Sequence, residues 1–131
     1  MIVLDTHAWV WYASGSAELS DRAREAIEPA AAAGTLYLSS ISALEVAQLA
    51  ACGRLQLRID ARDWIARAEM LPGLRIVPVD NHIAVKSVFL RPPLYNDPAD
   101  RIIVATALTL GVTLITRDER LHQYPHVRTL W

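Results

Sequence analysis

The sequence has 131 residues, of which 53% are hydrophobic and 21% are charged, and its formal net charge is −1. This length predicts one domain, residues 1–131, that is large enough to bury its own core. The apolar composition excludes a disordered chain and predicts that a partner or a second copy covers part of the apolar surface. The net charge excludes a polycation that binds nucleic acid through its overall field.

The cysteine count and the spread of apolar residues bear on the compartment. The single cysteine, Cys52, excludes an intramolecular disulfide and fits a reducing cytoplasm. No stretch reaches the roughly 18 apolar residues of a membrane span, and Asp5 interrupts the N-terminal apolar run too early for a signal peptide. We therefore expect a cytoplasmic protein with no membrane segment. Near a predicted helix end, Cys52 is expected to be a small core residue.

The first half of the chain predicts two strands and four helices. In order, these are a strand at 2–5, a helix through Trp9, Trp11 and Tyr12 that breaks at 14–16, a helix opened by Ser20 and stopped by Gly34, a strand at 35–38, a helix at 40–52 before Gly53, and a helix at 60–71. Pro29 lies inside the second helix, so we expect a kink there or an early end near Glu28.

The second half predicts three more strands. In order, its elements are a strand at 74–79, a helix from Asp80 that ends before Pro92, a helix at 97–110 stopped by Gly111, a strand at 112–116, a short helix at 118–123 and a strand at 127–130. Apolar strands without alternation, separated by helices, indicate a parallel sheet covered on both faces. The predicted fold class is α/β, in three α/β/α layers around a central parallel sheet of four to five strands.

Four acidic residues are predicted to lie near one edge of this sheet. Asp5 ends the first strand, and Asp118 follows the fourth. Glu45 lies one turn into the helix after the second strand, and Asp100 is in the first turn of the helix that leads to the fourth. Ligands in open α/β sheets bind beyond the carboxyl ends of the strands, so these acids are candidates for one site.

Each of these acids also has a purely structural interpretation. Asp5 and Asp118 both precede a predicted helix and suit an N-cap, as does Asp80. Asp97 is best explained as the N-cap of the helix that begins with a proline. Asp100 then lies three residues after the cap, where an acid that bonds back to the helix start is common.

Glu45 is the acid that a structural interpretation explains least well. It lies among apolar residues in ISALEVAQLAA, with no basic residue three or four positions away. A buried carboxylate needs a partner, and a metal ion is one such partner. Several oxygen ligands without a histidine or cysteine cluster point to a hard cation, Mg²⁺ or Mn²⁺, which can activate water and neutralise a phosphodiester.

Four stretches of the sequence together resemble a known family. MIVLDTHAWVWY, SSISALEVAQL, DPADRIIVATAL and LITRDERL occur in the order and spacing of PIN domains, specifically of the VapC-type toxins of bacterial toxin–antitoxin pairs. Each motif is weak alone, but the ordered set is specific and spans essentially the whole chain. The resemblance implies a PIN-like fold and a ribonuclease that depends on Mg²⁺ or Mn²⁺.

The resemblance further implies a catalytic and metal-binding role for the four acids. Asp5, Asp100 and Asp118 would hold the metal, some through water, and Glu45 would position a second ion or the attacking water. Metal-activated water would then cleave RNA phosphodiester bonds, leaving a 3′-hydroxyl and a 5′-phosphate. If Asp5 faces the ion, Thr6 can cap the helix instead.

Accessory roles are assigned to a few neighbours of these acids. The resemblance implies that Thr116 is a possible hydroxyl helper beside Asp118. Asp97 is a helix cap first and a supporting acid second. Arg101 and Arg117 flank the acids and either hold the RNA backbone or serve as counter-ions, whereas Arg120 lies further along and is expected to be solvated.

The aromatic helix and its histidine are expected to have structural or partner-binding roles. His7 follows Asp5 closely, but a lone histidine at a helix start is usually structural, so we interpret it as a bystander. Trp9 and Tyr12 lie one helical turn apart and suit either the core or a groove for a partner.

The resemblance also implies partners. These are an RNA substrate and a small antitoxin protein, VapB-like, that binds the toxin and blocks its site. A homodimer follows from the resemblance and the apolar composition together. The alternative function is a PIN-like binding or regulatory module without catalysis, against which the complete set of acids argues. Two enzyme alternatives fit poorly: a haloacid-dehalogenase-type phosphotransferase would need an acid where His7 stands, and a receiver domain would need a lysine after its last strand.

Overall fold

The central sheet in this computed structural model, which describes residues 1–131, has five strands that all run parallel. The strands are β1 (Ile2–Leu4), β2 (Leu36–Ser39), β3 (Leu74–Val77), β4 (Thr113–Ile115) and β5 (Thr129–Leu130). Their order is β3-β2-β1-β4-β5, so the first strand lies at the centre. Leu4 pairs with Leu38 on one side and Ile115 on the other, which brings the carboxyl ends of three strands together.

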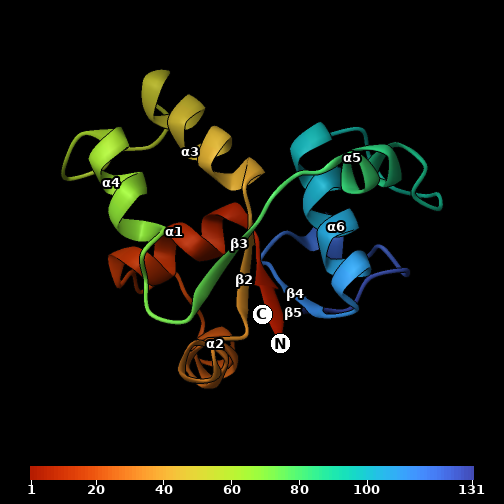
Figure 1. Ribbon diagram of the computed structural model, residues 1–131, viewed down its shortest axis with the longest axis horizontal. Helices are drawn as coiled ribbons and strands as arrows, with labels where there is room; N and C mark the ends of the chain where they lie inside the picture. The colour runs from red at the N-terminus through yellow and green to blue at the C-terminus, as the bar shows by residue number, and fades with distance from the viewer.

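Seven helices cover the two faces of the sheet. They are α1 (Thr6–Ser14), α2 (Asp21–Ala33), α3 (Ile41–Ala51), α4 (Ala61–Ala68), α5 (Asn81–Val88), α6 (Pro98–Leu110) and α7 (Glu119–His122). Figure 1 shows α1 to α4 on one side of the strands and α5 and α6 on the other. The predicted three-layer α/β/α fold is therefore confirmed. None of the helices combines the length and the hydropathy needed to cross a membrane.

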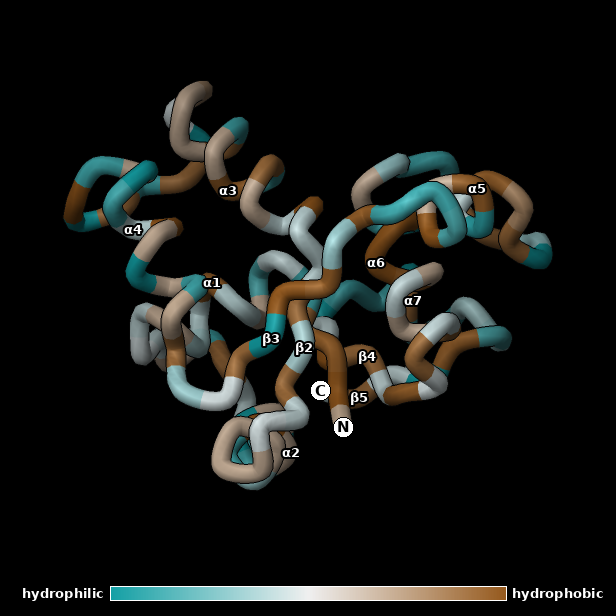
Figure 2. The backbone as a smooth tube through the Cα atoms, viewed as in Figure 1, coloured by the Kyte–Doolittle hydropathy of each residue, from teal (hydrophilic) through white to brown (hydrophobic).

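A separate apolar core fills each side of the sheet. On the α1 side, Trp9 and Leu38 are almost completely buried, and the indole of Trp9 donates a hydrogen bond to the Ala68 carbonyl at 3.1 Å. On the α6 side, Ile103 and Val104 pack against β1 and β4. Figure 2 shows the most hydrophobic backbone on the central strands and on much of α6. These cores fix the strand ends at which the candidate acids lie.

Helix α2 runs through Pro29 to Ala33, so the predicted early end near Glu28 is wrong. Ile27 and Ala30 are buried against the core on either side of the proline, and this packing holds the helix together. Pro29 has no amide hydrogen, so the carbonyl of Glu25 lacks its helical hydrogen bond. Glu25 is exposed, and water can therefore bond to this carbonyl instead.

The predicted helix caps are largely confirmed. Asp97 caps α6, with its Oδ1 atom accepting from the Asp100 amide at 3.0 Å, and a proline occupies the first turn. Asp80 caps α5 through the Ile83 amide. Cys52, by contrast, is exposed rather than part of the core, because α3 ends at Ala51 away from the sheet.

Candidate active site

The structure brings all four predicted acids to one pocket at the carboxyl edge of the sheet. Asp5 follows β1 directly, Asp118 follows β4, Glu45 lies on α3, and Asp100 lies in the first turn of α6. The pocket is lined by Asp5, Thr6, His7, Trp11, Glu45, Arg54, Asp97, Asp100, Arg117, Asp118 and Arg120. Only one of these lining residues is hydrophobic, so the pocket suits a charged, hydrated ligand.

Asp5 is both a helix cap and a member of the pocket. Its carboxylate is 8% exposed, and Oδ1 accepts a hydrogen bond from the Ala8 amide at 2.8 Å. The expectation that Thr6 caps this helix is therefore wrong. Burial raises the pKa of Asp5 to about 6, against the opposing effect of a hydrogen bond from the Thr116 hydroxyl. The buried carboxylate consequently favours a partner of positive charge when it ionises.

Glu45, on α3, has a polar partner on α1. The hydroxyl of Thr6 donates a hydrogen bond to Oε1 of Glu45, and it also contacts the hydroxyl of Ser42 at 2.9 Å. Burial still raises the pKa of Glu45 to about 7, and the negative charges of Asp100 and Asp97 raise it further. The partner that the apolar setting of Glu45 requires is thus only partly supplied by the protein.

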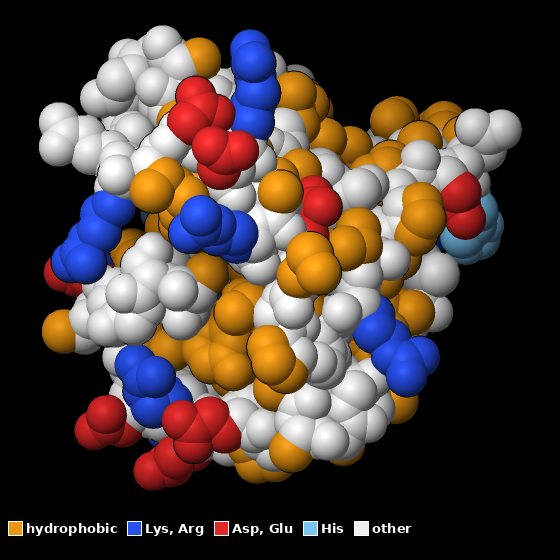
Figure 3. Space-filling model, turned by 60° about the vertical axis from the view of Figure 1, so that its left-hand side comes forward, with side chains coloured by type: hydrophobic (Ala, Val, Ile, Leu, Met, Phe, Trp, Pro, Cys, Tyr) orange, Lys and Arg blue, Asp and Glu red, His pale blue; other side chains and the backbone are white.

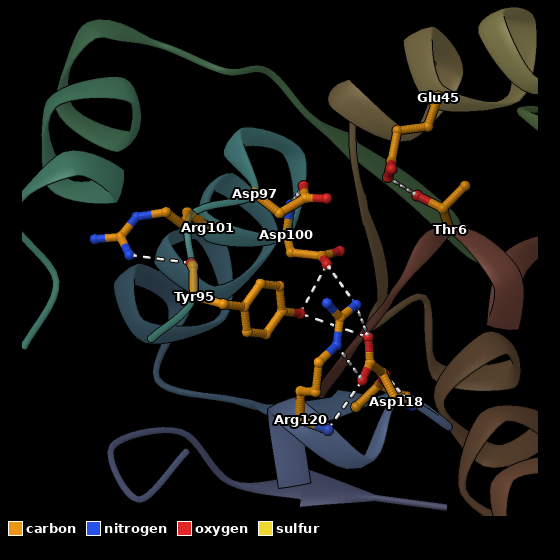
Figure 4. Close-up of polar contacts among 9 residues, drawn as sticks. Thr6, Glu45, Tyr95, Asp97, Asp100, Arg101, Asp118 and Arg120 are labelled. Atoms are coloured by element: carbon orange, nitrogen blue, oxygen red, sulfur yellow. Dashed lines mark hydrogen bonds and ion pairs between the residues drawn. The ribbon is translucent and has the colours of Figure 1, made fainter. Parts of the chain in front are cut away.

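Asp100 and Asp118 share a tyrosine on the opposite wall (Figure 4). The Tyr95 hydroxyl lies 2.7 Å from Oδ2 of Asp100, to which it donates, and 3.5 Å from Oδ2 of Asp118. Asp100 therefore faces the pocket instead of bonding back to the helix start. Burial raises the pKa of Asp100, in spite of this hydrogen bond.

Arg120 compensates part of this negative charge. Its Nη2 and Nε atoms donate to the two oxygens of Asp118 at 2.8 and 3.2 Å, and Nη2 lies 3.9 Å from Oδ2 of Asp100. The guanidinium carbon is 4.0 Å from the centre of the Tyr95 ring. These hydrogen bonds lower the pKa of Asp118. Arg120 is solvated, as expected, with a side chain that is 61% exposed, but the sequence did not predict its pairing with Asp118.

The donors of the pocket suit a hard divalent cation. They are carboxylate oxygens: burial raises the pKa values of Asp5, Glu45 and Asp100, whereas the hydrogen bonds from Arg120 lower that of Asp118. The Arg120 guanidinium already stands near two of these carboxylates as a positive charge. No group of three or more histidine, cysteine or acidic side chains is arranged around a single metal position. Mg²⁺ does not require such a cage, because it keeps several waters and needs only one or two carboxylates.

The accessory residues fall into two groups. Thr116 is buried beside the acids, and its hydroxyl accepts a hydrogen bond from the Asp118 amide at 3.1 Å. Asp97 lines the pocket while capping α6. Arg101 is not brought into the pocket: its guanidinium donates to four backbone carbonyls, including those of Ser87 and Tyr95.

Arg117 and His7 line the rim of the pocket. Arg117 forms an ion pair with Glu18, and its guanidinium carbon lies 5.4 Å from the centre of the Trp11 ring. The His7 ring packs against Trp11 with centroids 5.4 Å apart. Neither residue forms a hydrogen bond or an ion pair with the four acids, although the electrostatic effect of His7 is among those that lower the pKa of Asp5.

Sequence reasoning missed the roles of three residues that shape or line the site. Tyr95 lies in a loop with no recognisable pattern, and no signal in the sequence points to its role. Arg120 does carry a signal, because its position two residues after Asp118 lets its side chain fold back onto the capping carboxylate. Arg54, just beyond α3, also lines the pocket, and nothing in its sequence context predicts this.

Comparison with known proteins agrees with this arrangement. The family model of the PIN domain matches residues 2–127, which is nearly the whole chain and includes all four acids. The chain is a PIN domain. The resemblance seen in its motifs is therefore confirmed.

Relatives of this PIN domain include toxins. Ribonuclease VapC22 of Mycobacterium tuberculosis (strain ATCC 25618 / H37Rv) is 36% identical over 132 residues, covering 99% of this chain and 98% of that protein. VapBC2 from Rickettsia felis, solved bound to a promoter DNA fragment, has a TM-score of 0.70 at 18% identity over 99% and 98% of the two chains. A toxin–antitoxin complex from Klebsiella pneumoniae has a TM-score of 0.63 at 25% identity over 97% and 95%. The chain thus belongs with the VapC-type PIN domains.

Proposed function

We propose that this PIN domain is a ribonuclease that depends on Mg²⁺ or Mn²⁺ and acts as the toxin of a toxin–antitoxin pair. The observation that carries the proposal is the convergence of Asp5, Glu45, Asp100 and Asp118, from four separate elements, on one polar pocket. The 36% identity to a protein named a ribonuclease supports RNA as the substrate. The pocket is lined by five carboxylates and three arginines, so a bound cation would favour the approach of an RNA phosphate.

In this proposal Asp5, Asp100 and Asp118 would hold the metal, some of them through water, and Glu45 would position a second ion or the attacking water. A bound divalent cation supplies a Lewis acid that lowers the pKa of water and neutralises the phosphodiester. The raised pKa of Glu45, about 7, suits a group that takes a proton from water near neutral pH. Thr116 holds the backbone of Asp118, and Asp97 holds the start of α6. Cleavage then leaves a 3′-hydroxyl and a 5′-phosphate.

The arginines at the rim supply the attraction for RNA that the acids lack. Arg54 and Arg117 line the pocket, and Arg54 is exposed and has no acidic partner. Guanidinium groups at these positions can pair with backbone phosphates on either side of the scissile bond. Each such contact adds to affinity without reading the base sequence.

We further propose a small antitoxin as partner, because the solved relatives include toxin–antitoxin complexes. An apolar groove between the end of α1, the loop after α3 and α4 suits such a partner. Leu57, Ile59, Trp64 and Leu71 are among the residues that line it. Figure 3, with the α4 side brought forward, shows apolar side chains gathered on this face.

A second apolar surface supports the proposal of a homodimer. On α5 and its C-cap, Val85, Val88 and Phe89 are 58%, 65% and 80% exposed. A second copy would cover these side chains and remove apolar area from water. The free, exposed Cys52 fits the reducing cytoplasm in which we place the protein.

The test is cleavage of labelled RNA by the purified protein with Mg²⁺, Mn²⁺ or EDTA. Asp5→Asn keeps the hydrogen-bond acceptor that caps α1, and Asp100→Asn keeps the size of the side chain. Both variants are expected to lose metal-dependent cleavage by at least about a hundredfold while remaining folded. The 5′-phosphate is detected by ligation of the product ends.

The wild-type protein and both variants distinguish the enzyme from a binding module. A non-catalytic module would bind RNA equally well in all three and cleave it in none. Full activity in both variants would mean that the acids are structural caps only. Circular dichroism and thermal unfolding of each variant exclude loss of the fold as the cause.

A further inference from the structure

Arg120 occupies the side of the pocket where two of the proposed metal ligands meet. It binds both oxygens of Asp118 side-on and reaches toward Asp100, with the Tyr95 ring beneath its guanidinium. Figure 4 shows the guanidinium between the tyrosine and the two carboxylates. No other cationic side chain forms an ion pair with either acid.

At this position Arg120 competes with a divalent cation for the same oxygens. A Mg²⁺ ion lies about 2.1 Å from a carboxylate ligand. Nη2 of Arg120 already lies 2.8 Å from Oδ2 of Asp118 and 3.9 Å from Oδ2 of Asp100. A cation bound to either oxygen would share it with the guanidinium, and the two positive charges would repel each other.

The side chain of Arg120 is free to leave. It is 61% exposed, and it is not packed in the core. Its partners are Asp118, the nearby Asp100 and the face of Tyr95. An ion pair at this exposure is worth little, so its exchange for a metal ion costs little. The Tyr95 ring offers a surface on which the guanidinium can slide toward the rim.

We propose that Arg120 is an internal counter-ion that the divalent cation displaces, and that the released guanidinium then binds the RNA phosphate. The inference rests on the proposed metal-dependent cleavage of RNA. It assigns Arg120 two opposite effects: it weakens metal binding, and it strengthens RNA binding once the metal is in place. Arg120 offsets part of the negative charge that Asp100 and Asp118 bring to the pocket.

The first measurement is the affinity of the full chain for Mn²⁺. It is determined by titration calorimetry and by the electron paramagnetic resonance signal of free Mn²⁺. Arg120→Gln removes the charge and is expected to bind Mn²⁺ about five to ten times more tightly than the wild type. Arg120→Lys keeps the charge but loses the side-on pair, and its affinity should lie between the two. The exposure of Arg120 makes both variants foldable, and thermal unfolding checks this.

Arg117→Gln is the matched control, because Arg117 lines the same pocket but pairs with Glu18. Its Mn²⁺ affinity is expected to equal that of the wild type. If Arg120 only holds Asp118 in place for the metal, Arg120→Gln will bind Mn²⁺ more weakly. Unchanged or weaker binding in Arg120→Gln therefore overturns the proposal, whereas failure of the wild type to bind Mn²⁺ overturns the proposed function as well.

The second measurement is RNA affinity in a Glu45→Gln background that stops turnover. Fluorescence anisotropy of a labelled RNA is compared with Mg²⁺ and with EDTA. Mg²⁺ is expected to raise the affinity of Glu45→Gln about tenfold and that of Glu45→Gln/Arg120→Gln less than threefold. An equal gain in both proteins would show that the released arginine does not bind RNA, and would overturn that half of the proposal.

Discussion

The hydroxyl of Thr6 donates a hydrogen bond to the carboxylate of Glu45, which lies 39 positions further along the chain. Thr6 is buried and follows Asp5 directly, so this bond ties the strand end that bears one proposed metal ligand to the helix that bears the proposed base. It also stabilises the charged form of Glu45, which burial disfavours. A single hydroxyl thus links the chain segment next to Asp5 to the helix that carries Glu45.

Replacing Thr6 by valine should change the pH dependence of cleavage. Valine keeps the shape but removes the hydrogen bond that lowers the pKa of Glu45, so this pKa rises above its value of about 7. The acidic limb of the pH–rate profile should then shift upward by up to about one unit, with activity largely recovered near pH 9. The measurement is initial cleavage rate from pH 5.5 to pH 9.

Thr6→Ser is the matched control because it retains the hydroxyl. Its pH profile should overlay that of the wild type, with at most a modest loss of stability from the missing methyl group. A parallel drop of the Thr6→Val rate at every pH, with no shift of the limb, would show that Thr6 acts on geometry and not on the ionisation of Glu45.

The raised pKa values of the acids predict that the metal-free protein loses stability as pH rises. Burial raises the pKa of Asp5 from 3.8 to about 6 and that of Glu45 from 4.5 to about 7. At a pH between the ordinary and the raised pKa of each acid, the folded state binds more protons than the unfolded state. The free energy of unfolding therefore falls from about pH 4 to pH 7. Asp118 has a lowered pKa and loses its contribution only below about pH 4, outside this window.

Urea unfolding in EDTA at pH 4 and pH 7.5 measures this effect. Asp5→Asn cannot ionise and keeps the cap, so it should be more stable than the wild type at pH 7.5, by up to about 3 kcal/mol, and nearly equal to it at pH 4. A wild-type protein whose stability increases over this range would contradict the assignment of buried, uncompensated acids. Any extra stability of Asp5→Asn at pH 7.5 would then have a cause other than the ionisation of Asp5.

Divalent metal should reverse that loss of stability. Saturating Mn²⁺ at about 100 times its dissociation constant stabilises the folded state by about 2.7 kcal/mol at pH 7.5. At pH 5 the gain should be much smaller, because Asp5 and Glu45 are then largely protonated. Differential scanning calorimetry with and without Mn²⁺ measures the shift in Tm, and equal ionic strength of NaCl controls for screening. A shift of the same size at both pH values would place the metal elsewhere.

The sequence was sufficient for the sheet and its acids because both depend on regular patterns. Short apolar runs predicted five strands. The predicted strand at 127–130 is longer than β5 (Thr129–Leu130), and the predicted strand at 74–79 is longer than β3 (Leu74–Val77). Acids placed at strand ends and in first helical turns must meet once the strands are parallel. The topology alone therefore fixed the place of Asp5 and Asp118 in the pocket.

What the sequence could not predict depends on side-chain direction and on packing. Arg101 follows Asp100 directly, but the helix turns it to the opposite side, toward α5 and the loop before α6. Arg120 folds back onto Asp118 because the loop after β4 turns there. Pro29 is tolerated because the core holds α2 on both sides of it. No periodicity in the chain encodes these contacts.

Arg101 offers the last prediction, because its contacts are structural although it lies beside a proposed metal ligand, Asp100. Its guanidinium donates to the carbonyls of Ser87, Val88, Leu94 and Tyr95, at 2.9 to 3.3 Å, and so ties α5 and the Tyr95 loop to α6. Arg101→Met removes all of these donors and leaves carbonyls unpaired, which should cost about 2 to 3 kcal/mol of unfolding free energy in urea.

The same variant should leave the salt dependence of RNA binding unchanged. Arg101 faces away from the pocket and reaches no phosphate, so the slope of log Kd against log salt should match the wild type, measured below the unfolding temperature of the variant. Arg117→Gln, at the rim of the pocket, should reduce that slope by about one phosphate contact. A reduced slope in Arg101→Met, with stability unaltered, would instead place Arg101 on the RNA and contradict the tethering role.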